Sequence, residues 1–556
     1  KFISYSKNVE LKEILPNIDY RGGYKLQGSE FVADGGKYAD AKIVFKKAGK
    51  DIFIANARRF SIGDDRIVAQ AAGVKIFFDH DSIFHANLQF TYIDSERKLR
   101  LYRKVNGPSG APLLNTYHNL TMDFELLEWK IDSDIITFGS LPTSAQSSVE
   151  FESVDRYLQS KYESIQGIDA IHPLFLVRSY VTTNQEEEFY VKDFARFAQF
   201  PLVQIQHYLI RLANDGFIFY DFGRQKITVL PKLYNYIESA SGLGDYDVIS
   251  FRSIIKSGEY DTESDHLVNA ELNLATKDLS LLGINSIQVS QNRGVYFFPK
   301  DGKIIIKKNR DFIFDGQVFA GDGRLNLFGK DFLFHYDDFK VDLNYIDSMQ
   351  LSVPVYPLRK DIYDRDILTP IKTIIEAVTG DLRIDHPTNK SGIRIDSFPE
   401  FPIFSSYNPS YAYYDRKSIH DGVYKRSSCF FHLQPFEIDS INNYTAKGLW
   451  FAGVFESSGI FPAFNDTLRI QKDYSLGFNR KTPEKGFEIY GGKGKYYNNI
   501  SLSHDGIKGN GDFEYLTSKA SASDIFFFPD STNLYTQLFV ISEVLDGVEF
   551  PDVNNT

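Results

Sequence analysis

Residues 74–102, which read VKIFFDHDSIFHANLQFTYIDSERKLRLY, decide the fold class of this chain. Apolar and polar side chains alternate in Val74–Phe78, in Asn87–Tyr92 and again in Lys98–Tyr102. Such alternation places every second side chain on the buried face of a strand. Asp94 and Ser95 stand between two of these runs, where a turn is expected. The stretch therefore predicts an antiparallel meander of strands.

The same pattern extends the predicted meander over residues 18–105. Alternation recurs in Ala41–Phe45 and Ile52–Ala55, and strands resume through Met122–Trp129 and Ile135–Phe138. The 48 Phe and 34 Tyr residues raise the aromatic content to 15%, and aromatic side chains favour pleated sheets. We therefore predict a mainly β protein of extended, twisted antiparallel β-layers.

The length of 556 residues corresponds to about three to four domains. We expect a β-meander domain, a helical module, a β-domain, and a second β-domain with one short helix, at 1–150, 151–240, 241–360 and 361–556. That short helix is predicted over Pro370–Thr379, because Thr369 can cap its start and Gly380 can end it. A hairpin with Asp301-Gly302 at its tip is predicted in the third segment.

In the helical module the apolar residues recur at helical spacing instead of alternating. Ser153 and Gly167 are suited to begin and end a first helix, and two further helical stretches follow at Val191–Ala198 and Leu202–Asn214. Two strands come next, at residues 216–220 and 226–230. Two helices joined by a short turn and followed by a two-stranded wing form the winged-helix pattern.

Aromatic residues followed closely by glycine recur in the predicted strands. The theme occurs at Tyr20…Gly22, Phe314…Gly316, Phe451…Gly453 and Tyr490…Gly492. Glycine inside a strand marks a bulge or a close approach of two backbones. We therefore expect one style of β-layer to be used repeatedly.

Composition excludes several classes of protein. The net charge of −11 is poorly suited to phosphate backbones, and the single Cys429 excludes a disulfide framework or a multi-cysteine metal site. No window reaches 18 consecutive apolar residues, so no transmembrane helix is expected. Residues 1–30 contain no secretory apolar segment. Because the chain begins at Lys1 rather than Met, we expect it to be a processed or excised piece of a longer protein.

Signals of catalysis are few, and we predict that the chain is not an enzyme. No Walker A loop, G-x-S-x-G elbow or H-E-x-x-H motif occurs. Asp79-His80-Asp81 with His85 is the densest group of metal-binding residue types, but a polar turn explains it better. Asp385-His386 resembles a base and its orienting partner, without a nucleophile to activate. No catalytic, cofactor-binding or metal-binding residue is assigned.

The winged-helix pattern raises the question of nucleic-acid binding. In its second helix the predicted buried stripe consists of Leu202, Ile205, Leu209 and Leu212. The opposite, exposed stripe consists of Gln204, His207, Arg211 and Asn214. A face that binds DNA needs several Lys or Arg residues for phosphates, and this stripe has one. We therefore expect a docking role, with Gln204, His207, Arg211 and Phe219 as candidate contact residues for the chain's own β-layers or for a protein partner.

Several stretches resemble large, uncharacterised cell-envelope proteins of the Bacteroidota. The residues that carry this resemblance are DSIFHA (81–86), LIRLANDGFIFYDFG (209–223), LTPI (368–371), YDRKSIHD (414–421), SGIFP (458–462) and DYSLGF (473–478). The aromatic–glycine strands also resemble the β-layers of AsmA-like and lipopolysaccharide-bridge proteins. The resemblance implies a periplasmic or outer-membrane-associated location, and as partners an envelope protein complex or the remainder of a longer chain, with lipid as a further candidate.

Bacteroidota envelope proteins are often O-glycosylated at Asp-Ser/Thr followed by an aliphatic residue, Met or Thr. Such triplets place candidate glycosylation sites at Ser82, Ser348, Ser440, Thr467 and Ser531. About two triplets are expected by chance in a chain of this composition.

Together with the lack of catalytic motifs, the resemblance implies a non-enzymatic envelope scaffold that assists outer-membrane biogenesis or moves lipid or lipopolysaccharide through a β-layer groove. The first alternative is a polysaccharide-binding or polysaccharide-active envelope protein, and the second is a winged-helix nucleic-acid binder. A cleft with two carboxylates beside an exposed Tyr or Trp favours the first alternative. A continuous apolar groove favours lipid handling, and the absence of both favours a scaffold.

Overall fold

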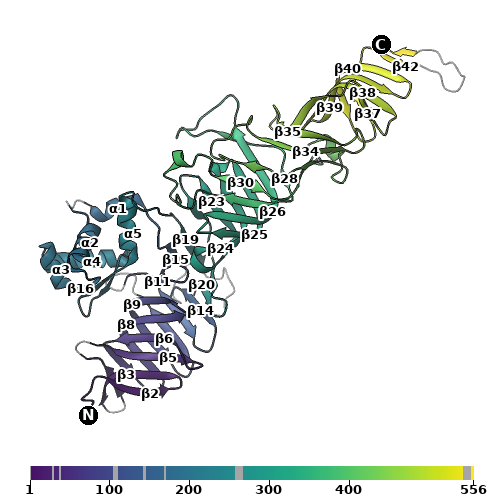
Figure 1. Ribbon diagram of the computed structural model, residues 1–556. Helices are drawn as coiled ribbons and strands as arrows, with labels where there is room; N and C mark the ends of the chain where they lie inside the picture. The colour runs from purple at the N-terminus through teal and green to yellow at the C-terminus, as the bar shows by residue number, and fades with distance from the viewer. Residues whose placement is uncertain are drawn as a thin grey trace.

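The computed structural model describes residues 2–27, 30–36, 39–103, 110–141, 146–167, 171–256, 267–541 and 553–555. Strands hold 52% of the chain and helices 12%, so the fold is mainly β and antiparallel, as predicted. Figure 1 shows an elongated molecule with its two termini at opposite ends and the helices on one side. We call the strands outside residues 154–249 the β-rod, and the helices with their small sheet the helical module.

The first part of the β-rod contains β1 (Phe2–Ile3), β2 (Val9–Leu15), β3 (Ile18–Gln27), β4 (Glu30–Asp34), β5 (Ala41–Lys47), β6 (Lys50–Ala57), β7 (Arg59–Ile62), β8 (Arg66–Phe78), β9 (Asp81–Ile93), β10 (Lys98–Tyr102), β11 (Leu113–Asn115), β12 (Leu120–Asp123), β13 (Leu126–Lys130), β14 (Ile135–Gly139) and β15 (Gln146–Ser153). The helical module contains α1 (Gln159–Gln166), α2 (Pro173–Asn184), β16 (Glu188–Tyr190), α3 (Val191–Ala198), α4 (Leu202–Asn214), β17 (Ile218–Asp221), β18 (Lys226–Val229) and α5 (Pro231–Ala240).

The β-rod continues with β19 (Ser250–Lys256), β20 (Val268–Asn273), β21 (Leu279–Leu281), β22 (Ile287–Ser290), β23 (Val295–Ile306), β24 (Phe312–Ala320), β25 (Leu325–His335), β26 (Lys340–Pro354), β27 (Leu368–Pro370), β28 (Ile375–Glu376), β29 (Val378–Arg383), β30 (Ile403–Ser406), β31 (Ser410–Tyr413), β32 (Cys429–Leu433) and β33 (Glu437–Ile438). Its last strands are β34 (Trp450–Ser457), β35 (Phe464–Ile470), β36 (Leu476–Lys481), β37 (Phe487–Ile489), β38 (Gly494–Ser503), β39 (Gly506–Tyr515), β40 (Ser518–Phe527), β41 (Thr532–Leu534), β42 (Phe539–Ile541) and β43 (Val553–Asn555).

The long strands in the middle of the β-rod bend where their pairing register shifts. Such shifts fall between Pro299 and Ile304 of β23, and between Phe314 and Gly316 of β24. The strands β25 and β26 shift at corresponding places along their lengths. Because a bulge bends its strand and increases the local twist, a row of bulges folds the sheet along a crease. The sheet thus forms a trough whose two walls face each other.

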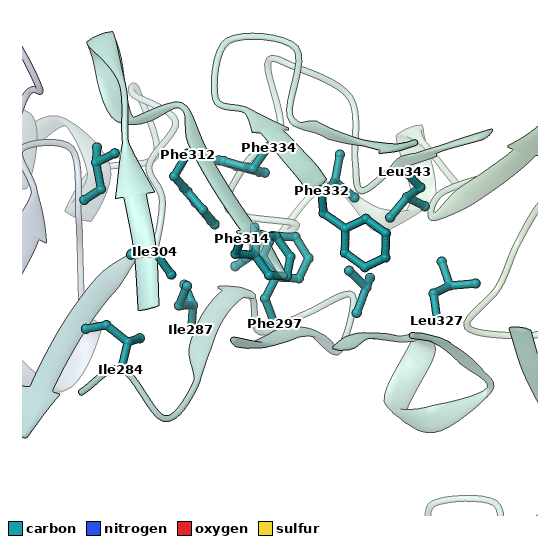
Figure 2. Packing of buried hydrophobic residues seen from close by; sticks show 14 of the residues in the cluster. Ile284, Ile287, Phe297, Ile304, Phe312, Phe314, Leu327, Phe332, Phe334 and Leu343 are labelled. Carbon is teal, nitrogen blue, oxygen red and sulfur yellow. The ribbon is translucent and has the colours of Figure 1, made fainter. Parts of the chain in front are cut away.

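Phenylalanine rings fill this trough. Register pairs Phe312 with Phe334 and Phe314 with Phe332, so these rings lie on the same inner face. Phe297 stacks on Phe314 with ring centroids 4.9 Å apart, and Figure 2 shows the side chains converging from both walls. The cluster of buried apolar residues runs without a break from Ile18 to Phe527. A single core therefore connects the two ends of the β-rod.

Two glycines of the aromatic–glycine theme lie at a bulge or at a close approach of two backbones, as predicted. Gly316 has φ +138° beside the bulge of β24, and a Cβ at this position would collide with the Phe298 carbonyl oxygen. A Cβ added to Gly453 would lie equally close to the carbonyl oxygen of His432 on β32. One glycine thus marks a bulge and the other a close backbone approach.

The predicted helix at Pro370–Thr379 is wrong. The segment instead contains the last residue of β27, then β28 and the start of β29, and its Ile371 N–H donates to the Leu351 carbonyl of β26. Ile371 and Ile375 are buried in the main core. Thr, Ile and Val occupy most of the helix interior that was expected, and β-branched side chains favour strands once a neighbouring strand is present.

The predicted hairpin at Asp301-Gly302 is also wrong. Both residues have positive φ, but β23 continues through them and pairs with β24 on both sides. Asp-Gly here supplies the left-handed backbone of the crease. Strand pairing also crosses the expected domain limits near 150, 240 and 360, through β15 with β19 and β26 with β29, and those limits stay predictions.

Candidate functional site

The helical module joins the β-rod through two neighbouring strands. The chain leaves the β-rod at the end of β15 and returns to it at the start of β19, and these strands pair from Gln146 with Lys256 to Glu152 with Ser250. The module is therefore an excursion with a narrow base. In the module, α3 and α4 begin and end where predicted. Helix α1 begins at Gln159 rather than near Ser153 and ends at Gln166, with Gly167 as its C-cap.

Phe219 of β17 makes an apolar contact between the module and the β-rod, and Leu230 belongs to the same cluster. Its ring lies 5.2 Å from the Phe84 ring of β9 and 5.5 Å from the His85 ring, and Ala111 borders the same cluster. Strand alternation turns Ile218 and Tyr220 the other way, into the core of the module. Phe217 packs on Tyr236 in the same core, because β17 begins only at Ile218.

A buried ion pair lies beside this contact. The Lys232 ammonium of α5 lies 3.0 Å from a carboxylate oxygen of Glu152 on β15. Burial opposes ionisation of Glu152, but the charges of Lys232 and Arg156 outweigh it and lower the pKa of Glu152 to about 2. Burial in turn lowers the pKa of Lys232. The last helix of the module is thus tied to the strand that leads into it.

A second polar network closes the base of the module. The buried carboxylate of Asp247 accepts hydrogen bonds from the Ser153 hydroxyl at 2.6 Å and the Tyr336 hydroxyl at 2.7 Å. The Arg310 guanidinium stacks 3.5 Å from the centre of the Tyr336 ring and donates to Asp155 at 2.6 Å. Asp155 at the start of the excursion and Asp247 at its end therefore both interact with Arg310 and Tyr336. Networks of this kind hold one orientation.

A polar crevice of about 390 Å³ separates the wing from the first layers of the β-rod. Arg224, in the turn between β17 and β18, forms an ion pair with Asp40 across it. Burial raises the pKa of Asp40 despite the guanidinium, and Asp221 adds to this effect. Glu188 of β16 and Lys226 of β18, which also line the crevice, pair with each other. Opposite charges thus occupy both sides of the crevice and neutralise each other.

The predicted docking residues do not form one site. Gln204, His207 and Arg211 lie on the exposed side of α4, whereas Phe219 lies buried against β9. A guanidinium N–H of Arg211 donates to the Ser164 carbonyl at 2.6 Å, so its charge caps the end of α1. Leu202, expected in the buried stripe of α4, is exposed.

The candidate glycosylation residues differ in accessibility. Ser82 is buried, its N–H donates to the Thr116 hydroxyl, and its carbonyl accepts a hydrogen bond from the Thr116 N–H. Ser348, Ser440 and Thr467 are half-buried, and Ser531 is exposed. Among these five residues, accessibility favours Ser531 as a site for a glycan.

The residue pairs weighed for chemistry have structural partners. Asp79 pairs with Lys277, and no group of three or more metal-binding side chains occurs within the described part of the chain. Asp385 holds the buried Arg293 at 2.6 Å, while the His386 imidazole bonds to Thr388 instead. Burial raises the pKa of the Cys429 thiol to about 12, so this thiol stays protonated.

An open cleft of about 1220 Å³ lies at the C-terminal end of the β-rod. Along this edge β41 pairs with residues 525–527 of β40 and β42 with residues 518–520, so that none of the described strands pairs with residues 521–524 between them. The cleft is lined by Tyr490, Phe513, Tyr515, Tyr535, Lys493, Asp524 and Asp530, among others. Sequence reasoning missed it, since a gap between two strand pairings leaves no local pattern.

Comparison with known protein families and with curated proteins gave no match to this sequence. None of the described helices has the length and apolar character needed to cross a membrane.

Proposed function

We propose that this chain is a non-enzymatic scaffold of the cell envelope, in which the β-rod holds the helical module and the C-terminal cleft at a fixed separation. The observation that carries the proposal is the filled trough. Its inner side chains, among them Phe297, Phe312 and Phe334, are completely buried, and one core runs through the whole β-rod. Close-packed side chains leave no room for an acyl chain, so the β-rod supports elements rather than conducting lipid.

Lipid transfer tests this proposal directly. The full chain is mixed with donor vesicles that contain a fluorescent phospholipid and with unlabelled acceptor vesicles. A scaffold leaves the transfer rate at its value without protein. A transfer rate that rises in proportion to the concentration of the chain would overturn the proposal and restore the lipid-conduit interpretation.

We also propose that the helical module is a winged helix used for protein contacts. Its support is the order of α3, a short turn, α4 and the strands β17 and β18, with β16 completing a three-stranded sheet. Contacts with the β-rod bury Phe219, and a bond to Ser164 engages Arg211. Titration with a DNA duplex at increasing salt is the test: tight binding with a steep salt dependence would contradict this role.

The C-terminal cleft favours a second candidate function, the binding of a polysaccharide. Tyr535 is exposed at its rim, and Asp524 and Asp530 line it. Aromatic rings stack on sugar faces while carboxylates accept hydrogen bonds from hydroxyl groups. Electrophoresis in native gels that contain xylan, laminarin or dextran tests this function. Retardation that is lost in Tyr535→Ala and kept in Tyr363→Ala, a change far along the sequence, supports it.

A further inference from the structure

Residues 355–367 form a hairpin that leaves the β-rod between β26 and β27, here called the hairpin arm. The Val355 N–H donates to the Ile367 carbonyl at 3.0 Å and the Asp361 N–H to the Arg365 carbonyl at 2.8 Å. An antiparallel bridge joins Lys360 to Asp366. The two segments of the arm are therefore hydrogen-bonded to each other as an antiparallel hairpin rather than forming an irregular loop.

The tip and the base of the hairpin arm are held by specific bonds. The Asp361 carboxylate accepts from the Tyr363 N–H at 2.8 Å and from the Arg365 N–H at 3.0 Å. At the base, Asp366 forms an ion pair with the buried Arg324 at 2.7 Å. These bonds restrict the arm before anything binds to it, which lowers the entropic cost of binding.

The arm presents large apolar side chains to solvent. Tyr356 is 88% exposed, Leu358 74%, Ile362 90% and Tyr363 72%. Scattered exposed apolar residues are common, but four within eight positions of one hairpin concentrate exposed apolar surface on it, and concentrated apolar surface marks interaction sites. Tyrosine in particular contributes strongly to the centres of protein interfaces.

The charges of the arm indicate what covers this patch. Lys360 pairs with Asp364 at 3.0 Å and Arg365 with Asp361 at 2.8 Å. Two of the three cations are thus neutralised within the arm, which leaves little attraction for an anionic membrane. Asp361 and Asp364 also flank the two apolar residues at the tip, and carboxylates are costly in hydrocarbon. A groove on a protein can cover the apolar side chains while the charged pairs remain at its rim.

Arg359 is the third cation of the hairpin arm. Its side chain is exposed and forms no ion pair with any residue that the structure describes. We propose that the hairpin arm inserts Leu358, Ile362 and Tyr363 into an apolar groove of a partner protein and that a carboxylate beside that groove meets Arg359. This inference rests on the scaffold function proposed above, and it names one element by which the scaffold holds another protein.

Site-directed photo-crosslinking tests the proposal. A benzoylphenylalanine is placed at Ile362 of the full chain in the cells that produce it, and at the equally exposed Leu243 as a control. We expect one discrete adduct from position 362 and none from position 243. The captured protein is then purified and titrated with the chain, with Ile362→Ser/Tyr363→Ser and with Leu243→Ser.

The expected result is at least ten-fold weaker binding for Ile362→Ser/Tyr363→Ser and unchanged binding for Leu243→Ser. Because all these side chains are exposed, the three proteins should share one thermal unfolding midpoint, which separates lost binding from lost folding. Three results would overturn the proposal: no adduct, an adduct of two copies of this chain, or sedimentation with phosphatidylglycerol vesicles that depends on Ile362 and Tyr363. The lipid-transfer assay tests the scaffold function separately. A failure of the scaffold function can therefore be told apart from a failure of the proposal for the hairpin arm.

Discussion

Phe219 shows how one side chain determines the placement of a whole module. It is the ring of β17 that leaves the module core and packs on Phe84 and His85 of the β-rod. We predict that Phe219→Ala destabilises this attachment by about 3 kcal/mol, because it removes a buried ring and leaves a cavity. Hydrogen exchange of the amides in α3 and α4 measures the effect, and the exposed Phe222 of the same wing gives the control Phe222→Ala. Equal exchange in both variants would contradict this role.

Glu152 gives the attachment a dependence on pH. Its pKa lies at about 2, below the ordinary value of 4.5, so its ionised form stabilises the folded state. That contribution is complete above pH 4.5 and is lost as the pH falls toward 2. We predict that Glu152→Gln lowers the thermal unfolding midpoint at pH 6 and shows a smaller further loss on acidification than the wild type. The exposed control Glu186→Gln should follow the wild type, and parallel curves for all three proteins would disprove the assignment.

At the scale of elements, the crease depends on backbone that only glycine adopts easily. Gly316 combines φ +138° with a close approach to the Phe298 carbonyl. We predict that Gly316→Ala lowers the free energy of unfolding by more than about 1 kcal/mol, because the substituted residue cannot keep this conformation. Gly63→Ala is the matched control, since a Cβ there meets its nearest atom only at 3.8 Å. Denaturant titration measures both changes, and equal stabilities would contradict the crease.

Local patterns predicted some elements to the residue and missed others. Helices α3 and α4 were predictable because their apolar spacing and the turn between them are local. The segment 370–379 was not, because its capping residues match a helix while the partner that makes it extended, β26, lies earlier in the chain. Asp301-Gly302 is a similar case: one dipeptide supports a hairpin or a crease, and the register of β24 decides between them.

At the scale of the molecule, composition and alternation predicted β-layers, but the filling of the trough required the structure. Phe219 was predicted from the sequence as a candidate contact with the chain's own β-layers. The Glu152–Lys232 pair was not predicted, because it joins residues 80 positions apart. The C-terminal cleft and the hairpin arm depend on which strands do and do not pair. Such features arise from tertiary pairing, which no local window of sequence contains.

We predict that one continuous core makes the β-rod a single rigid body that carries the helical module in a fixed place. Small-angle X-ray scattering from the full chain measures whether the molecule keeps one shape. We expect a profile that one elongated particle with the shape in Figure 1 reproduces without an ensemble. A profile that requires several relative positions of the module and the two ends, or a compact particle, would contradict it.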